Sequence, residues 1–94
     1  MEVFQKTKEA KLDYGFNWSR WLATNETIVS SSWSISGDGQ LTKVLDQVAS
    51  PTTVIYLDGG TSGRNYTVTN TVVTDSTPIA REESRMFRIK IGAR

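Results

Sequence analysis

Apolar and polar residues alternate with a period of two along most of the chain, and turn-forming residues interrupt the alternation at short intervals. Period two is the side-chain repeat of a β-strand, because successive side chains point to opposite faces. The interruptions lie at residues 37–39, 50–51, 58–63 and 75–78 and are rich in glycine, proline and aspartate, which favour tight turns. No long stripe of apolar residues has helical spacing, so the sequence predicts an all-β protein.

Six segments carry the strand pattern: residues 9–14 (extending at most to Trp18), 26–36, 41–48, 53–57, 65–74 and 85–91. In the second segment the phase slips between Ile28 and Trp33, which predicts a β-bulge near residues 29–31. The third segment fits either a strand or a short helical turn. The fourth is almost continuously apolar, as in a central strand covered on both faces. Segment 65–74 places Tyr66, Val68 and Val72 inward. Segment 85–91 places Phe87, Ile89 and Ile91 inward.

Six or seven strands without crossover helices predict antiparallel pairing. The expected fold is an immunoglobulin-like or fibronectin-III-like antiparallel β-sandwich, formed by residues 11–94 as a single domain. Tyr66 enters a late strand after a glycine-rich turn, as in a tyrosine corner, and an ordinary strand tyrosine is the alternative. Residues 1–10 are polar apart from Val3 and Phe4, so we expect an N-terminal arm that orders against a neighbour by strand addition.

Composition excludes several classes of function. The 94 residues include no cysteine and no histidine, so disulfides, thiolate metal sites and Ser-His or Cys-His catalytic pairs cannot form. The formal net charge of +1 is too small for electrostatic capture of nucleic acid. No apolar run approaches the roughly 18 residues of a membrane span. We therefore expect no cofactor, no metal, no nucleic-acid partner and no membrane partner.

No group of residues in the sequence has the pattern of a catalytic site. Several aspartates, including Asp38, Asp58 and Asp75, lie in turns, where the side chain caps local backbone donors. The glycine-rich loop 58–63 has neither the following lysine nor the helix of a phosphate-binding loop. No catalytic residue is expected, and the chain is not expected to be an enzyme.

The C-terminal segment is basic, with Arg81, Arg85, Arg88, Lys90 and Arg94. A nucleic-acid surface would interleave such residues with exposed aromatic rings, whereas Phe87 has the parity of a core position. Charged residues that guard a strand edge explain the pattern, and pairing with an acidic partner remains open.

Four of the nine aromatic residues lie between residues 14 and 21. Tyr14, Phe16 and Trp18 have period-two spacing and so share one face of a strand. So small a core does not readily hold all the rings of the chain, and we expect Trp18 and Trp21, which flank Arg20, to be partly exposed. The cluster fits a core, a protein-docking patch, or a sugar-stacking platform in which Tyr56 joins the two tryptophans.

The order of these motifs resembles small tailed-bacteriophage virion proteins. Residues 13–22 match D-Y-x-F-x-W-x-x-W-L, followed by x-T-I at 26–28 and S-W at 32–33. Residues 53–70 match T-x-[VI]-x-L-x-G-G-x-x-G-x-x-Y-x-V-x-N, and residues 85–89 match R-x-F-x-I. Residues 40–50 have no part in the pattern.

The resemblance implies an immunoglobulin-like domain of the fibre–tail adaptor type, without catalytic residues. The expected function is a structural adaptor that joins tail or neck components, or fibres, in a virion assembled in the host bacterial cytoplasm. Its partners would be other virion proteins and symmetric copies of itself. The expected protein-interface residues are Phe4, Trp18, Arg20, Trp21, Arg88 and Arg94. A capsid decoration protein and a carbohydrate-binding module with exposed tryptophans are the alternatives.

Overall fold

A computed structural model describes residues 2–92, which form seven β-strands and no helix. The strands are β1 (Glu2–Lys6), β2 (Lys11–Asn17), β3 (Ile28–Ser36), β4 (Leu41–Ala49), β5 (Thr52–Gly59), β6 (Asn65–Thr74) and β7 (Glu82–Ile91). The prediction of an all-β fold is confirmed. The segment that fitted either a strand or a helical turn is the strand β4.

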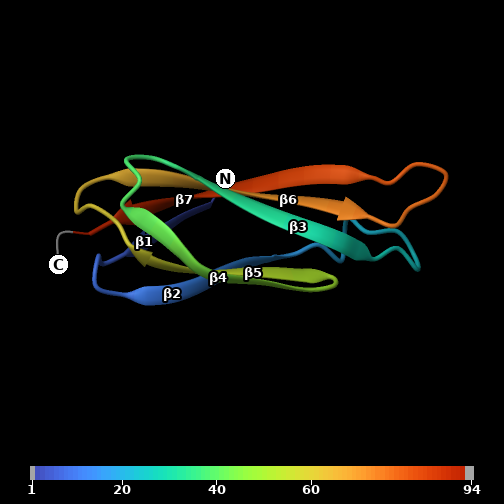
Figure 1. Ribbon diagram of the computed structural model, residues 1–94, viewed down its shortest axis with the longest axis horizontal. Helices are drawn as coiled ribbons and strands as arrows, with labels where there is room; N and C mark the ends of the chain where they lie inside the picture. Colours follow the sequence, from blue (N-terminus) through green and yellow to red (C-terminus); the bar gives the residue numbers. More distant parts are fainter. Residues whose placement is uncertain (1, 93–94) are drawn as a thin grey trace.

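The strands form two sheets that pack face to face as layers (Figure 1). One sheet has the order β1-β7-β6-β3 and the other β2-β5-β4. Six of the seven strands have the sheet partners of an immunoglobulin constant-type domain, in which the second, fifth and fourth strands face the third, sixth and seventh. The predicted β-sandwich is confirmed, and the molecule is elongated, with extents of 48 × 20 × 18 Å.

The first strand differs from the prediction. β1 pairs with β7 in parallel, with Phe4 opposite Ile89, so the pairing is not antiparallel throughout. The ring of Phe4 is half-buried and packs against Tyr14 and Phe87, at centroid distances of 5.1 and 5.3 Å. Because these contacts lie within the chain, the expectation that the arm orders only against a neighbour is wrong for Glu2–Lys6.

The core lies between the inner faces of the two sheets. Its main cluster of buried residues is Leu41, Ile55, Leu57, Tyr66, Val68, Phe87, Ile89 and Ile91. The predicted inward rows of β6 and β7 are confirmed, because their members are all at most 1% exposed. β5 is central in its sheet but buries only one face, since Val54 and Tyr56 on its outer face are half-buried. The predicted coverage of both faces is therefore wrong.

Two local predictions are confirmed. The register of β3 against β6 shifts between Ile28 and Ser30, which places a bulge at Val29. Tyr66 forms a tyrosine corner: its hydroxyl accepts a hydrogen bond from the Thr61 backbone N–H at 2.8 Å and donates to Asp38 Oδ1 at 2.6 Å. Gly37 lies against this ring, and a Cβ there would come within 2.3 Å of Tyr66 Cδ1.

Candidate protein-docking surfaces

Trp18 follows β2 directly and is fully buried, with 0% of its surface exposed. Its indole Nε1–H donates to Thr53 Oγ1 at 3.1 Å and to Asn70 Oδ1 at 3.2 Å. The Arg85 guanidinium lies 4.3 Å from the centroid of the indole ring. The expectation that Trp18 is partly exposed is wrong, because buried polar side chains from β5 and β6 satisfy its N–H inside the sandwich.

Asn70 is the hub of this buried polar group. It is fully buried on β6, accepts a hydrogen bond from Thr53 Oγ1 at 2.6 Å, and donates from Nδ2 to Ser31 Oγ and to the Ser32 carbonyl, both at 2.9 Å. The network therefore connects three strands and both sheets. Buried polar groups are costly unless they are paired, so this network fixes where Trp18 sits.

The turn after Trp18 brings Trp21 back over it. The N–H groups of Trp21 and Leu22 donate to the Trp18 carbonyl at 2.9 and 3.0 Å, and the two indole rings meet edge to face at 5.4 Å. Trp21 is half-buried, and the Arg81 guanidinium lies 4.3 Å from its centroid. A ring packed in this way has little free face for a ligand.

Glu26 and Arg81 tie two loops together. Arg81 Nε donates to Glu26 Oε2 at 2.9 Å and Nη2 to Oε1 at 2.7 Å, a bidentate pair. Arg81 Nη2 also donates to the Trp21 carbonyl at 2.8 Å. The Glu26 carboxylate, whose side chain is 4% exposed, further accepts hydrogen bonds from Thr74 Oγ1 and the Ala23 backbone N–H. We call residues 18–27 and 75–81 together the tryptophan end.

The electrostatics of the tryptophan end follow from these bonds. The hydrogen bond from Arg81, followed by those from Ala23 and Thr74, lowers the pKa of Glu26 to about 2. Asp75 accepts hydrogen bonds from the backbone N–H and the hydroxyl of Thr27, at 2.9 and 2.7 Å, and these lower its pKa as well. Both carboxylates are therefore charged at neutral pH and hold the loops in place.

Two shallow hollows flank the turn 23–26, where Asn25 adopts a positive φ of 65°. One has a volume of about 410 Å³ and the other about 450 Å³. The first lies between the two loops of the tryptophan end, and the second lies between the turn and Ser50-Pro51. The walls of the first are mostly polar and those of the second are mixed, which suits a loop or side chain of a partner better than a buried apolar ligand.

The tryptophan end also exposes an apolar residue that the sequence analysis missed. Ile79 is 76% exposed and lies in the β6–β7 loop, at the right in Figure 1. A large apolar residue between Pro78 and Ala80, inside a turn, is the signal that could have identified it. Arg20 is exposed on the other loop of the same end.

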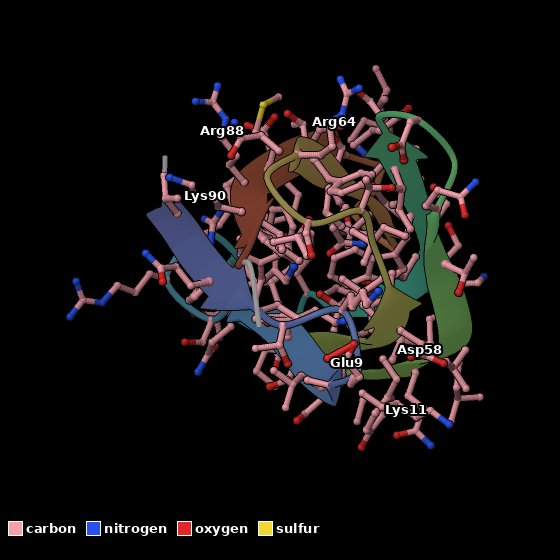
Figure 2. The ribbon with its side chains drawn as sticks, turned by 90° about the vertical axis from the view of Figure 1, so that its left-hand side faces the viewer. Glu9, Lys11, Asp58, Arg64, Arg88 and Lys90 are labelled. Carbon is pink, nitrogen blue, oxygen red and sulfur yellow. The ribbon has the colours of Figure 1, made fainter. Side chains whose placement is uncertain are left out.

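The remaining predicted interface residues lie elsewhere. Phe4 packs into the core, and Arg88 is exposed on the outer face of β7, opposite Thr67 and Val3. Figure 2 shows Arg88 with Arg64 and Lys90 on the side of the four-stranded sheet, and Glu9, Lys11 and Asp58 on the other side. Arg94 lies outside the described residues. The structure thus brings Trp18, Arg20 and Trp21 together and separates Arg88 from them.

The outer face of β4 is a second candidate surface. Val44, Leu45 and Val48 are each about half exposed, at 51%, 49% and 46%. Leu45 lies opposite Tyr56 on the outer face of the three-stranded sheet. Val48 lies opposite the buried Thr53, on the other face, and Val44 lies at the register shift, so Leu45 is the apolar residue that the outer face of β4 offers to a partner.

Within residues 2–92, no three His, Cys, Asp or Glu side chains are grouped so that they could hold a metal ion. The described part of the chain also contains no helix long and apolar enough to cross a membrane.

The sandwich, its tyrosine corner and its docking surfaces define an all-β protein of the immunoglobulin-like class. A family model described as podophage GP4 fiber-tail adaptor protein gp77 matches residues 6–90. The chain therefore belongs to this family, as its sequence motifs indicate, and a fibre–tail adaptor is a structural part of a phage virion. No curated protein matches the chain.

Proposed function

We propose that this chain is a non-enzymatic adaptor that joins tail or neck components, or fibres, of a tailed-phage particle through protein–protein contacts. The observation that carries the proposal is the match of residues 6–90 to a family of fibre–tail adaptors. The neighbours would be other virion proteins, and symmetric copies of the chain would be incorporated during assembly in the bacterial cytoplasm. Repeated contacts of moderate strength then give firm attachment.

The tryptophan end is the best-supported contact site. Its two loops are held together by the Glu26–Arg81 pair, so a partner would meet a preorganised surface. Ile79 supplies an exposed apolar contact, Arg20 an exposed charge, and the hollows beside the turn 23–26 receive partner side chains. Trp18 and Trp21 support this surface indirectly, because their packing positions the loop that carries Arg20.

A second contact site uses the basic side of the four-stranded sheet. Arg88 lies there with Arg64 and Lys90, so this surface suits an acidic partner (Figure 2). Arg94 belongs to the same basic segment of the sequence and stays in the proposal as a contact. Phe4 supports the surface by anchoring β1 beside β7.

The alternatives have less support. A sugar-stacking platform needs rings with a free face, but Trp18 is buried and Trp21 packs against Arg81 and Trp18. A decoration protein would share this fold, and copy number separates it from an adaptor. Decoration proteins cover a capsid in far more copies than a tail attachment site holds.

The experiment is quantitative mass spectrometry of purified virions. We expect the polypeptide at a fixed, low copy number relative to the tail proteins. Absence from the particle overturns the adaptor function, and a copy number that follows the major capsid protein supports the decoration role instead.

A further inference from the structure

The two sheets end in four edge strands: β1 and β3 in one sheet, β2 and β4 in the other. An edge strand presents unpaired backbone N–H and C=O groups to any chain that approaches. Proteins usually guard such edges with charged residues, proline, bulges or short length. The four edges of this protein differ in how they are guarded.

Three of the edges are guarded. β1 has only five residues and ends in Lys6, which is buried and donates from Nζ to the Gly59 carbonyl at 2.7 Å. β2 carries Lys11 and Asp13 on its exposed positions. β4 has a register shift between Lys43 and Leu45, and it carries an ion pair between Lys43 and Asp46.

The ion pair on β4 is directed inward. Lys43 lies opposite Leu57 and Asp46 opposite Ile55, and both partners are buried on the inner face of β5. Inward-pointing charges at an edge are a device that prevents the addition of another strand. β4 is therefore a poor site for strand pairing, although Leu45 on its outer face is 49% exposed.

β3 is the least guarded edge, although at its first residue the Ile28 N–H already donates to Ser50 Oγ at 3.2 Å. Its nine residues, Ile28–Ser36, include no charged residue and no proline, and its bulge is confined to Val29 at one end. Its neighbour β6, with ten residues, has no charged residue either. The charged residues of this sheet lie on β7 and β1, on the far side of β6.

The inner side of β3 is incompletely covered. Trp33 and Ile35 point toward the core yet are only half-buried, because no strand lies beyond β3 in its sheet. An added strand would cover the parts of both side chains that solvent still reaches.

We infer that β3 pairs antiparallel with β3 of a second copy of this chain, across a two-fold axis. An antiparallel edge offers the same donors and acceptors after a two-fold rotation, so it is complementary to itself. Neither β3 nor β6 carries charge, so two copies meet at this edge without repulsion between like charges. Serine hydroxyls at residues 30, 32, 34 and 36 meet across the new pair, where they can exchange hydrogen bonds.

The result is one continuous sheet of eight strands that runs through both copies. A single strand pair buries less than the roughly 1,200 Å² of a standard interface, so association in solution is weak and becomes firm where a particle holds copies together. The place of this dimer in a virion rests on the proposed adaptor function. The pairing itself is a property of the purified chain and is tested without the particle.

The test is sedimentation equilibrium of the purified chain up to about 1 mM, the range in which weak association becomes measurable. We expect the average mass to rise toward that of a dimer. Ser34→Lys, on the exposed outer side of β3, weakens association by roughly tenfold or more. Gln47→Lys makes the same change on the outer face of the guarded edge β4 and leaves association unchanged. An equimolar mixture of Ser34→Lys with Ser34→Glu restores it.

A wild type that stays monomeric over this range overturns the inference, as does equal weakening by Ser34→Lys and Gln47→Lys. Hydrogen exchange adds a second measurement: amides of residues 28–36 gain protection at high concentration, and protection gained on β4 instead also overturns it. A monomer that is nevertheless found in purified virions disproves the dimer and leaves the adaptor function standing.

Discussion

The two ends of the sandwich are closed in similar ways by aromatic residues with a polar atom. At the tryptophan end the buried indole of Trp18 donates to Thr53 and Asn70. At the opposite end the Tyr66 hydroxyl accepts from Thr61 and donates to Asp38. In both, a large ring fills the end of the core and its polar atom finds partners inside the protein.

The ends differ in the sequence distance of their bonds. The backbone bond to Tyr66 comes from five residues upstream and its bond to Asp38 spans 28 residues, whereas the two partners of the Trp18 indole are 35 and 52 residues away. The tryptophan end also adds the Glu26–Arg81 pair and the exposed Ile79. The tyrosine end thus contains a local turn bond beside one longer-range bond, whereas the Trp18 indole at the tryptophan end is held by long-range bonds alone, and this end presents a surface to solvent.

Trp18→Ala should have the largest effect on stability. The change removes a fully buried ring, the donor to Thr53 Oγ1 and one of the two donors to Asn70 Oδ1. We expect a loss of about 3–5 kcal/mol in the free energy of unfolding, most of what a small domain has. Urea denaturation followed by circular dichroism measures it.

Trp21→Ala is the control for this prediction. It removes the same side chain from a half-buried site three residues further on. Its effect should be clearly smaller, and equal losses would contradict the assignment of Trp18 as the residue that closes this end.

Tyr66→Phe tests the opposite end with a smaller expected effect. The ring stays, but the Thr61 N–H loses its acceptor and Asp38 loses a donor. We expect a loss of about 1–2 kcal/mol. Tyr56→Phe makes the same change on a half-buried ring of the outer face and should stay within about 0.5 kcal/mol of wild type.

This contrast explains what the sequence could predict. Alternation identified the strands, the phase slip identified the bulge at Val29, and a tyrosine after a glycine-rich turn identified the corner, because each signal lies within a few residues. The burial of Trp18 depends on Asn70 and Thr53, whose parity in the sequence does not reveal a hydrogen-bond network. Nor does a polar five-residue segment reveal that β1 pairs with β7.

The candidate interface, too, could be predicted only where its signals lie close together in the sequence. The sequence identified the loop that carries Arg20 and Trp21 from its dense aromatic residues, but it could not bring Arg81 to them from 60 residues away. The sequence pattern did not identify Ile79 as a contact residue, because a single apolar residue in a turn has no periodicity. Position along the chain gives strands and turns, whereas a docking surface depends on which loops the sheets bring together.

Lowering the pH should destabilise the folded protein partly by protonating Glu26, and Glu26→Gln should remove this part of the pH dependence. The folded-state pKa of Glu26, about 2, lies below its ordinary value of 4.5. Its contribution to stability is therefore complete above pH 4.5 and is lost as the pH falls toward 2. Urea denaturation at a series of pH values should show a shallower decline for Glu26→Gln than for wild type.

Two further variants sharpen this comparison of the ends. The pKa of Asp38 is also lowered, chiefly by the Tyr66 hydroxyl, so Asp38→Asn should remove a separate part of the decline, and the two effects should add. Glu82→Gln changes an exposed glutamate on β7 and is the control. An identical pH profile for Glu26→Gln and wild type would show that the Arg81 pair contributes nothing to the folded state.

Ile79→Asp should have the smallest effect on stability and a large effect on assembly. The side chain is 76% exposed, so the free energy of unfolding should change by no more than about 0.5 kcal/mol. If the tryptophan end binds a partner, a buried charge without a counterion at the contact should sharply reduce the number of copies in purified virions. Mass spectrometry of virions from a complemented infection measures this number.

Leu45→Asp is the matched variant on the outer face of β4, where Leu45 is also exposed. Normal incorporation of Leu45→Asp beside failed incorporation of Ile79→Asp assigns the contact to the tryptophan end. The reverse result assigns it to the outer face of β4. In either case the long-range network around Trp18 would be required for folding. The comparison of Ile79→Asp with Leu45→Asp decides whether the loops that this network positions also form the contact surface in the virion.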